Sequence, residues 1–553
     1  APDAAPKALK GPDALVKQIR DVMEPISRMD GDSLPVSAFE GNVNGEWEQG
    51  ASAYEKRGTA VMVPEWDAEK CIQCNQCAFV CSHATIRPFC LTADEAANAP
   101  ESTKLADTKP KASEYKFTMA VSPLDCMGCG ECVTVCPTKA IEMKPQESQA
   151  AQQAAFDYCV ENIRKKDNIP GVVSDISVKG SQFNQPLLEF SGSCAGCAET
   201  SYARLITQLF GEKMFISNAT GCSSIWGGTA SISPYTTNKE SGFGPAWINS
   251  LFEDNAEHGL GMQIGYETVR ANLITKVEAL KGKNADLDAV IDKYLETKNN
   301  TKANDAPAKA LIAALEACGC DESKEILKDK QYLAKKSFWI FGGDGWAYDI
   351  GYGGLDHVLA SGHDVNVMVF DTEMYSNTGG QASKASNIGE VCQFAAAGKE
   401  ISKKSLAEIC MTYGYIYVAQ IALGANMAQA VKAIAEAEAY PGPSIIIGYA
   451  PCELHGVKGG MTNCQNEMKK AVEAGYWNLF TFNPANKAQG KNPFTLTSKA
   501  VDAEKYQALL ANETRYSRLT RAFPDRAKQL FARNEQVAND RYEHLTRLVE
   551  LYK

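Results

Sequence analysis

The clearest pattern of apolar and polar residues lies in the second half of the chain. The segments SFWIF (337–341) and VNVMVF (365–370) are short apolar runs, and IGYGGLDHVLASG (350–362) between them has helical spacing. Two strands joined by a helix predict a βαβ unit, whose strand ends form a ligand crevice. A third apolar run, SIIIGYA (444–450), predicts another strand.

Helical spacing predicts most of the remaining elements. We expect a short helix over 12–26, a linker helix over 149–166, helices packed on the main sheet over 266–336, and a helix pair over 514–553. The last pair is interpreted as a wrapping or dimer-contact element without chemistry of its own.

Composition and charge narrow the class of protein. The 553 residues are 44% hydrophobic with a net charge of −11, which argues against wholesale binding of nucleic acid or anionic membranes. No apolar run approaches the roughly 18 residues that span a bilayer, and the N-terminus lacks the apolar core of a signal peptide. The chain begins at Ala without Met, which predicts a processed chain or one piece of something longer. Nothing points to an oxidising compartment, so we expect a cytoplasmic protein with no membrane and no nucleic-acid partner.

Eight of the nineteen cysteines form two identical C-x2-C-x2-C-x3-C motifs. The first motif consists of Cys71, Cys74, Cys77 and Cys81, and the second of Cys126, Cys129, Cys132 and Cys136. This spacing is typical of two-cluster ferredoxins, in which three cysteines of one motif bind a [4Fe–4S] cluster with the fourth cysteine of the other. We therefore predict that Cys136 completes the first cluster and Cys81 the second. Zinc or buried thiols would explain one C-x2-C pair but not two complete motifs.

Two features depart from a minimal ferredoxin. Ser82 stands where the pattern usually places proline, from which we expect a change in turn stiffness rather than a lost cluster. The segment 94–116 between the motifs is interpreted as an inserted surface loop because of its Ala, Pro and charged residues.

A third cysteine group is looser. Cys194 and Cys197 lie in GSCAGCAET, and Cys222 lies in NATGCSSIWGG. A cluster needs a fourth thiolate, and the downstream candidates are Cys318, Cys320, Cys392, Cys410, Cys452 and Cys464. Cys452 is favoured because it follows the apolar run at 444–450, at the end of a strand where α/β active sites gather. A two-thiol redox or zinc site is the rival, and the C-x-C pair at 318–320 is interpreted as structural.

The predicted βαβ unit carries a second chemistry. Its first turn contains Gly342, Gly343, Asp344 and Gly345, and its second strand ends in the segment 371–377. A glycine-rich turn with an acidic residue beside further oxygen ligands suits Mg²⁺ bound to a diphosphate. The pattern resembles the thiamine diphosphate motif, GDG followed about thirty residues later by Asn. Under that resemblance Asp344, the Thr372 hydroxyl and the Met374 carbonyl bind Mg²⁺. Nucleotide binding lacks its usual motifs here, and a plain βα turn is the remaining alternative.

Together the motifs resemble those of pyruvate:ferredoxin (flavodoxin) oxidoreductase, in its C-terminal part. GSCAGCAET, GGDGWAYDIG, DTEMYSNTGGQ and APCELHG occur in the family's order, and the resemblance covers about residues 30–485. It implies that the third cluster is bound by Cys194, Cys197, Cys222 and Cys452. It implies that thiamine diphosphate contacts Glu199, Cys222, Gly343, Asp344, Gly345, Trp346, Thr372, Glu373, Met374, Tyr375, Ser376 and Asn377, with Asn377 close to the reacting carbon.

The implied fold is an α/β thiamine-diphosphate-binding domain preceded by an α+β two-[4Fe–4S] ferredoxin-like domain. We expect a leader segment (1–60), the ferredoxin-like domain (61–150), the thiamine diphosphate domain with the proximal cluster site (151–485) and a C-terminal helical extension (486–553).

The implied activity is oxidative decarboxylation of pyruvate with coenzyme A to acetyl-CoA and CO₂, as in anaerobic metabolism. Electrons would pass through three [4Fe–4S] clusters to ferredoxin or flavodoxin. The family's pyrimidine-binding half is not in this sequence, so we expect it as a separate partner chain, with a dimer of the assembled enzyme. The alternatives are an enzyme for 2-oxoglutarate or a branched-chain 2-oxoacid, and a non-catalytic electron-transfer subunit.

Overall fold

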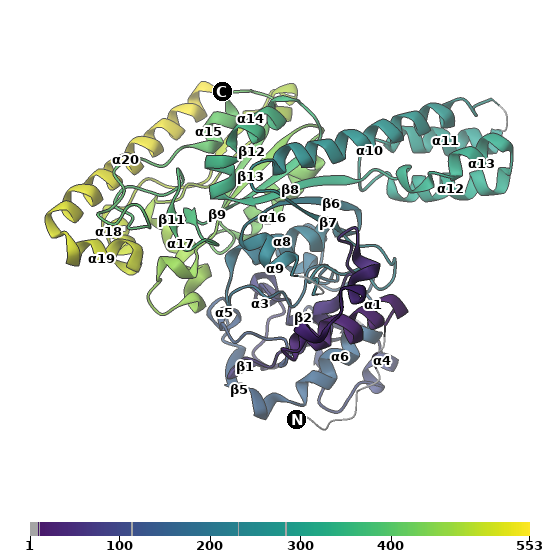
Figure 1. Cartoon of the computed structure of the whole chain (residues 1–553), viewed down its shortest axis with the longest axis horizontal. Coiled ribbons are helices and arrows are strands. Elements are labelled where there is room, and N and C mark those ends of the chain that lie inside the picture. Colours follow the sequence, from purple (N-terminus) through teal and green to yellow (C-terminus); the bar gives the residue numbers. More distant parts are fainter. Residues whose placement is uncertain (1–8, 10, 112–113, 230–231, 283–284) are drawn as a thin grey trace. The chain divides into compact units, whose positions relative to one another are not determined.

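The chain forms two compact units in the computed structural model, which describes residues 9, 11–111, 114–229, 232–282 and 285–553. The first unit comprises residues 1–212 and 222–245, and the second comprises 213–221 and 246–553. Both units are drawn in Figure 1, where the colours follow the sequence. The boundary expected at residue 150 falls inside the first unit.

The first unit begins with the short helix expected over 12–26. It is one helical stretch made of α1 (Asp13–Gln18), a π-helical turn η1 (Ile19–Met23) and α2 (Glu24–Ser27). Leu15, Ile19 and Met23 recur every fourth residue, so they share one face, and that face packs on Ala51. Three 3₁₀ turns follow, η2 (Gly31–Ser33), η3 (Val36–Asn42) and η4 (Ala51–Tyr54).

The two cysteine motifs lie in an α+β fold with two small antiparallel sheets. One sheet pairs β1 (Met62–Trp66) with β5 (Ile141–Pro145), and the other has the order β2 (Ile86–Leu91), β4 (Lys116–Val121), β3 (Ala106–Asp107). The short helices α3 (Gln76–Val80) and α5 (Glu131–Thr134) follow the cysteine loops. Trp66, Phe117 and Phe183 stack edge to face between them, with centroids 5.8 and 6.4 Å apart. These rings belong to one buried cluster that also contains Cys77 and Cys132, one cysteine from each motif.

The inserted segment 94–116 has more structure than the loop expected there. It contains most of α4 (Ala93–Ala97), whose first turn is closed by a capping box between Thr92 and Glu95. It also contributes β3, which pairs with β4. Composition alone missed both elements because the helix is one turn long and the strand only two residues. Ala112 and Ser113 lie outside the described residues.

The remaining helices of the first unit follow the second motif. After the 3₁₀ turn η5 (Gln146–Gln149), α6 (Gln152–Asn162) confirms the helix expected over 149–166. Two further helices are α7 (Val178–Ser181) and α8 (Ala198–Phe210), followed by the 3₁₀ turn η6 (Gly211–Lys213) and by α9 (Cys222–Gly227).

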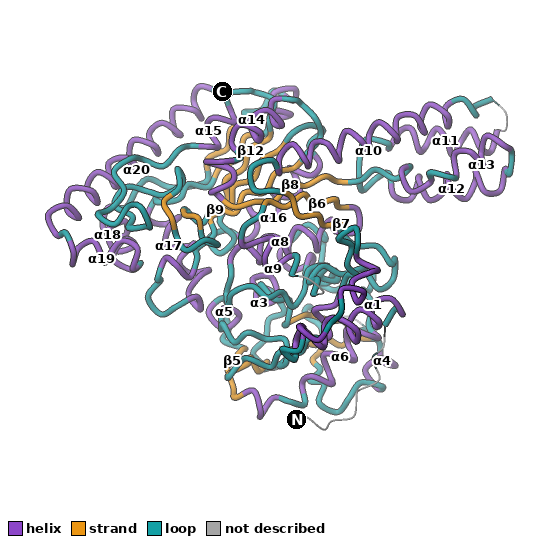
Figure 2. Tube along the Cα trace, viewed as in Figure 1, coloured by secondary structure: helices purple, strands orange, loops and turns teal. Residues whose placement is uncertain are grey.

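The second unit is built on an eight-stranded sheet, whose strands are orange in Figure 2. Its order is β15 (Phe494–Leu496), β14 (Phe480–Phe482), β12 (Tyr417–Ile421), β13 (Ser444–Tyr449), β9 (Asn366–Asp371), β8 (Ser337–Gly343), β6 (Met214–Ala219), β7 (Ala246–Ser250). The six strands from β12 to β7 are parallel. At the other edge β14 pairs antiparallel with β12, and β15 pairs antiparallel with β14. The expected βαβ unit and the strand over 444–450 are confirmed.

Helices cover the sheet and connect its strands. The βαβ crossover consists of the π-helical turn η8 (Gly345–Ile350) and α14 (Tyr352–Ala360). The other helices are α15 (Leu406–Met411), α16 (Met427–Ala439), α17 (Cys464–Ala474), α18 (Ala503–Asn512), α19 (Thr514–Ala522) and α20 (Pro524–Leu551). Short elements are η7 (Lys330–Tyr332), η9 (Glu453–His455), η10 (Met461–Asn463), η11 (Pro484–Gln489) and the hairpin β10 (Met374–Tyr375) with β11 (Gln381–Ala382).

The helices expected over 266–336 form, but most of them do not pack on the sheet. Only the first half of α10 (Asn255–Glu278) contacts the sheet. Gly259 allows this close contact, because a Cβ atom on residue 259 would lie 2.5 Å from Ile340 Cγ1. Its second half joins α11 (Ala285–Thr297), α12 (Asp305–Cys318) and α13 (Asp321–Leu327) in an arm with its own apolar core (Figure 1). The periodicity indicates an apolar face but not which surface covers it.

The C-x-C pair interpreted as structural lies in this arm. Cys318 at the end of α12 is exposed, and its Sγ lies 3.1 Å from that of Cys320. Cys320 is partly buried and packs against the apolar core of the arm, so the structural interpretation stays a prediction.

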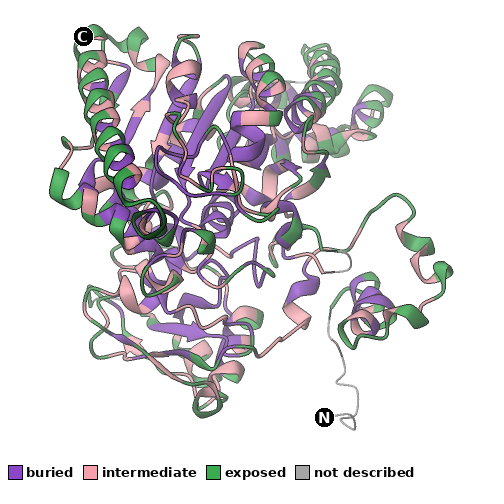
Figure 3. Cartoon of the chain, turned by 60° about the vertical axis from the view of Figure 1, so that its left-hand side comes forward, coloured by how far each residue is buried: buried purple, intermediate pink, exposed green. Residues whose placement is uncertain are grey.

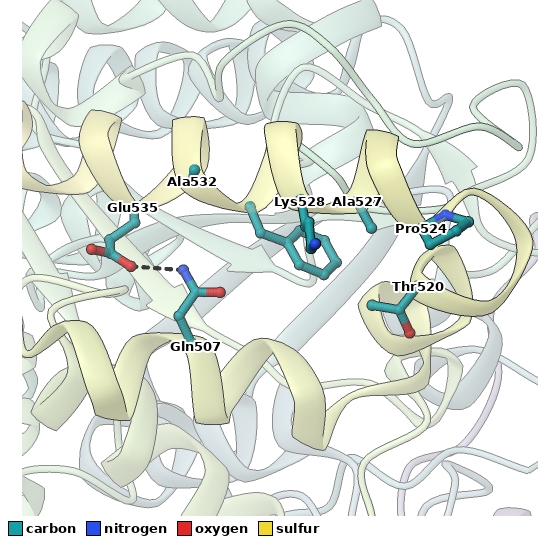
Figure 4. A pocket seen from close by; sticks show the side chains of 8 residues that line it. Gln507, Thr520, Pro524, Ala527, Lys528, Ala532 and Glu535 are labelled. Atoms are coloured by element: carbon teal, nitrogen blue, oxygen red, sulfur yellow. Dashed lines mark hydrogen bonds between the residues drawn. The ribbon is translucent and has the colours of Figure 1, made fainter.

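The C-terminal helices wrap the antiparallel edge of the sheet. Figure 3 shows the main strands buried and α20 exposed along its outer side. A surface hollow of about 440 Å³ lies between α18, α19 and α20, lined by Gln507, Thr520, Pro524, Ala527, Lys528, Phe531, Ala532 and Glu535 (Figure 4). Among the described residues, no helix is both long and apolar enough to cross a membrane.

Candidate functional site

Three oxygens converge at the carboxyl ends of β8 and β9. Asp344 directly follows β8, and Thr372 directly follows β9. The Thr372 hydroxyl lies 2.8 Å from Asp344 Oδ1, and the Thr372 backbone N–H donates to the same oxygen at 3.1 Å. The hydroxyl also lies 2.9 Å from the carbonyl oxygen of Met374. The structure thus brings together the oxygens that the thiamine diphosphate motif would use for Mg²⁺.

This oxygen set fits a hard divalent cation. In an octahedral Mg²⁺ site with bonds of about 2.1 Å, neighbouring ligands lie about 3 Å apart, close to the observed 2.8 and 2.9 Å. Burial raises the pKa of Asp344 well above its usual range, and Asp371 adds to this shift, so an ionised Asp344 requires a nearby cation. Among the described residues, no group of three or more His, Cys, Asp or Glu side chains is placed to hold one single metal ion. This site combines one carboxylate with a hydroxyl and a carbonyl.

The glycines of the first turn serve different purposes. A Cβ on Gly342 would lie 2.3 Å from the Trp346 ring, and one on Gly345 would lie 2.6 Å from the Tyr375 ring. Both glycines are therefore required by the packing of neighbouring rings rather than by a ligand. Gly343 is different, because its nearest neighbour would be the Phe370 carbonyl at 3.9 Å. The open approach to this backbone is the one that suits a diphosphate.

The second loop runs from the interior to the surface. Thr372, Glu373 and Met374 are buried, Tyr375 and Ser376 are partly buried, and Asn377 is exposed. The Ser376 hydroxyl donates to the Thr372 hydroxyl at 2.7 Å. The Glu373 carboxylate faces the core, where Lys403 Nζ lies 3.1 Å away. Only the backbone of Glu373 is therefore in a position to contact a cofactor.

His455 supports this loop and was not singled out from the sequence. Its Nε2 lies 2.7 Å from the Thr372 carbonyl oxygen, so Nε2 carries the proton. Burial lowers the pKa of His455 to about 3, with the Arg515 charge acting in the same direction, so the ring is neutral. The only signal in the sequence was its position in APCELHG, three residues after Cys452.

The two cysteine motifs repeat one backbone conformation. Gln73 and Gly128 occupy the same position in their motifs and are both left-handed, with φ of 59° and 72°. Their N–H groups donate to Cys71 Sγ and Cys126 Sγ respectively, each at 3.3 Å. The residues two positions later in each motif are left-handed as well. Two matching loops with amides directed at sulfur suit two equivalent clusters.

The fourth cysteines lie with the opposite motif. Burial raises the pKa of the Cys77 thiol well above its usual range, and the neighbours that add to this shift are Cys71, Cys74 and Cys136. Burial likewise raises the pKa of Cys132, and its strongest electrostatic neighbours are Cys129, Cys126 and Cys81. Cys136 and Cys81 are thus electrostatic neighbours of the opposite motif, as the crossed arrangement requires, and the assignment of the ligands stays a prediction.

Ser82 replaces the usual proline with a hydrogen-bonded link. Its hydroxyl lies 2.9 Å from Nδ1 of His83, and Nε2 of His83 lies 3.1 Å from the Ser193 carbonyl oxygen. Ser193 precedes Cys194, so this link ties the first cysteine motif to the third cysteine group. The turn is thus stiffened by hydrogen bonds where a proline ring would otherwise do it.

The cysteines expected to bind the third cluster come from both compact units of the chain. Cys194 is exposed, Cys197 precedes α8, and Cys222 begins α9, all in the first unit. Glu199, also in α8, is buried, which raises its pKa to about 7, and Trp226 Nε1 donates to its carboxylate at 3.4 Å. Cys452 follows β13 in the second unit, at the strand end where it was expected. The four-cysteine set stays a prediction.

Three protein families match segments of the chain. Residues 5–60 match a family described as EKR, a domain of unknown function, and residues 70–140 match the 4Fe-4S dicluster domain. Residues 327–447 match the C-terminal TPP binding domain of thiamine pyrophosphate enzymes. The two domains expected from the sequence are therefore present, in the expected order.

The chain is also similar to longer proteins that are named oxidoreductases. Pyruvate-flavodoxin oxidoreductase of Enterobacter agglomerans is 49% identical over 97% of this chain and 46% of its own length. Pyruvate:ferredoxin oxidoreductase of Moorella thermoacetica is 50% identical over 96% of this chain and 46% of its own length. The chain is homologous to the C-terminal part of the pyruvate:ferredoxin (flavodoxin) oxidoreductases.

The chain spans about half the length of these oxidoreductases. It also matches the pyruvate dehydrogenase [NADP(+)] of Euglena gracilis at 44% identity, over 97% of this chain and 30% of that protein. Among solved structures, a 2-oxoglutarate:ferredoxin oxidoreductase from Magnetococcus marinus shares 15% identity at a TM-score of 0.30, covering 47% of this chain and 64% of that one. That likeness is too distant to carry an argument.

Proposed function

We propose that the chain is the catalytic and electron-transfer part of a 2-oxoacid oxidoreductase. The reaction is the oxidative decarboxylation of pyruvate with coenzyme A to acetyl-CoA and CO₂, with electrons passed to ferredoxin or flavodoxin. The observation that carries the proposal is the Asp344–Thr372–Met374 oxygen cluster, present in the same chain as two complete ferredoxin motifs.

The residues of the second unit would hold thiamine diphosphate through Mg²⁺. Asp344, the Thr372 hydroxyl and the Met374 carbonyl supply oxygen ligands, and the open backbone at Gly343 admits the diphosphate. When bound, thiamine diphosphate supplies the electron sink for decarboxylation. The remaining proposed contacts are Glu199, Cys222, Gly345, Trp346, Glu373, Tyr375, Ser376 and Asn377. Asn377, at the exposed end of the loop, is proposed to lie nearest the substrate.

The cysteines of the first unit would hold the clusters. Cys71, Cys74, Cys77 and Cys136 bind one [4Fe–4S] cluster, and Cys126, Cys129, Cys132 and Cys81 bind the second. The third, proximal cluster is assigned to Cys194, Cys197, Cys222 and Cys452. Amides that donate to cysteine sulfur, such as those of Gln73 and Gly128, stabilise the more negative, reduced form of a cluster.

The relatives are about twice as long as this chain. We propose that a separate N-terminal chain supplies the pyrimidine-binding glutamate and the residues that recognise pyruvate and coenzyme A. The assembled enzyme is proposed to be a dimer in the cytoplasm, with ferredoxin or flavodoxin as electron acceptor.

The test uses protein purified anaerobically with every copurifying chain retained. Pyruvate is added without coenzyme A, and electron paramagnetic resonance records whether the clusters become reduced. A reduced-cluster signal with pyruvate supports the proposed activity and substrate. A signal only with 2-oxoglutarate or a branched-chain 2-oxoacid keeps the activity and changes the substrate. No signal with any 2-oxoacid, in a preparation with full iron, thiamine diphosphate and partner chain, leaves a non-catalytic electron-transfer subunit.

A further inference from the structure

The C-terminal extension contributes a buried arginine, Arg515, to the interior of the second unit. Arg515 lies in the first turn of α19 and is 1% exposed. Its Nη1 lies 2.8 Å from Glu373 Oε2 and 3.2 Å from Glu390 Oε1. Its Nε donates to Glu513 Oε2 at 2.7 Å. One guanidinium thus serves three buried carboxylates, one of them in the loop after β9.

Glu373 joins Arg515 to the oxygen cluster. Its second oxygen, Oε1, meets Lys403 Nζ at 3.1 Å and accepts from the Asn387 amide at 2.7 Å. Lys403 also pairs with Asp371, the last residue of β9, at 2.8 Å. Glu373 therefore lies between two cations, Lys403 from the sheet side and Arg515 from the extension.

The backbone of Glu373 needs such support. Its φ is 62°, in the left-handed region that residues other than glycine rarely adopt. A conformation of this kind persists only where the surroundings hold it. Glu373 stands between Thr372 and Met374, the two residues whose oxygens face Asp344. Release of its carboxylate would therefore let both oxygens turn away.

The electrostatics are consistent with a fixed carboxylate. The Glu373 side chain is fully buried, with Lys403 Nζ 3.1 Å from one oxygen and Arg515 Nη1 2.8 Å from the other. Removal of one of its two cations leaves a buried charge without full compensation, which strongly disfavours the observed arrangement.

We propose that Arg515 is a positioning residue for the Mg²⁺ site: through Glu373 it holds the loop after β9 so that the Thr372 and Met374 oxygens face Asp344. The affinity for Mg²⁺ and thiamine diphosphate then depends on the C-terminal extension, although the extension supplies no ligand. The identity of the bound group rests on the proposed function.

The experiment measures the affinity of the native assembly for thiamine diphosphate in the presence of Mg²⁺. The cofactor is removed by dialysis, and binding is followed by quenching of tryptophan fluorescence. Arg515→Met should raise the Kd at least tenfold, and Arg515→Lys should raise it less, because a lysine keeps the charge but not the planar fork. Iron content should stay at the wild-type level in both. Saturating cofactor and Mg²⁺ should restore kcat, which a simple loss of folded protein would not allow.

Arg518→Met is the matched control on the same helix. Arg518 donates from Nη2 to the Val391 carbonyl at 2.6 Å and has no contact with Glu373 among the described interactions. Its substitution disturbs the anchoring of α19 but should change the Kd by less than twofold. If Arg515→Met does not fold, the Kd of Arg515→Lys for thiamine diphosphate tests the inference instead.

Two results would contradict the inference differently. A wild-type Kd in folded Arg515→Met or Arg515→Lys, or an equal rise in Arg518→Met, overturns the positioning role and leaves the proposed function intact. Wild-type assembly that binds no thiamine diphosphate with Mg²⁺ overturns both.

Discussion

Asp344 and Thr372 are joined across two neighbouring parallel strands by a hydroxyl–carboxylate contact of 2.8 Å. The contact exists because β8 and β9 end at the same edge of the sheet, in register, with Gly343 opposite Phe370. It brings residues from two different turns into one oxygen cluster. The proposed chemistry of the second unit depends on this contact.

Asp344→Asn should abolish tight cofactor binding without affecting the clusters. The substitution keeps the shape of the side chain but removes its charge. A contact to a charged group contributes roughly 1.5–3 kcal/mol, so we expect Kd to rise about 10- to 150-fold. Thiamine diphosphate bound to purified assembly and its iron content are the measurements. Asp349→Asn is the control, since Asp349 is a carboxylate of the same turn that pairs with Lys384 at 2.9 Å and not with Thr372. Full cofactor retention in Asp344→Asn would disprove the Mg²⁺ assignment.

Double variants test the crossed cluster ligands. Cys81→Ser with Cys126→Ser changes two ligands of one proposed cluster, so about one third of the iron should be lost. Cys81→Ser with Cys71→Ser changes one ligand in each of two clusters, so about two thirds should be lost. Iron per chain and the number of reduced-cluster signals distinguish the two patterns. The reverse order would show that each motif binds its own cluster, and equal losses from both pairs would contradict the crossed assignment.

Cys452→Ser tests the fourth ligand of the proximal cluster. It should lower iron by about one third while both ferredoxin-type signals persist. Cys464→Ser is the comparison, because Cys464 is a buried thiol at the start of α17 in the same unit and is a downstream candidate that the family resemblance does not select. Unchanged iron in Cys452→Ser, or a loss in Cys464→Ser, would move the fourth ligand elsewhere.

Because of Glu513, we expect the free energy of unfolding to fall as the pH rises from about 4.5 to about 7. Burial raises its pKa from 4.5 to about 7, against the opposing charge of Arg515. The folded chain then binds this proton more tightly than the unfolded chain does. The contribution is fully present below the unfolded pKa and is lost as the pH rises through 7, with a slope of at most about 1.4 kcal/mol per pH unit.

The measurement for Glu513 is the urea midpoint of the second unit's transition, compared between wild type and Glu513→Gln across this pH range. The neutral amide cannot titrate, so its profile should be flatter than that of wild type. Parallel profiles would mean that Glu513 is ionised throughout, paired with Arg515. In that case its contribution would not depend on pH in this window.

Sequence patterns were sufficient wherever the interactions are local. The apolar runs predicted β8, β9 and β13 to within a residue or two, because a fully buried parallel strand needs apolar side chains on both faces. The spacing of the cysteine motifs predicted the loops that carry Cys71 and Cys126. The same patterns failed for the arm over 266–336, where helical periodicity shows an apolar face but cannot name the surface that covers it.

The sequence by itself determined the chemical groups: two sets of four thiols, an acidic turn, and the polar loop that follows the next strand. Their spacing along the chain is local and leaves few alternatives. Only the tertiary structure decided that Gly342 and Gly345 make room for the rings of Trp346 and Tyr375, and that His455 hydrogen-bonds to the Thr372 carbonyl. It also decided that Arg515, from a helix with no visible chemistry, pairs with Glu373. A buried charge must be paired, and its partner depends on which elements pack together. A local sequence pattern carries no information on that packing, so it cannot predict the partner.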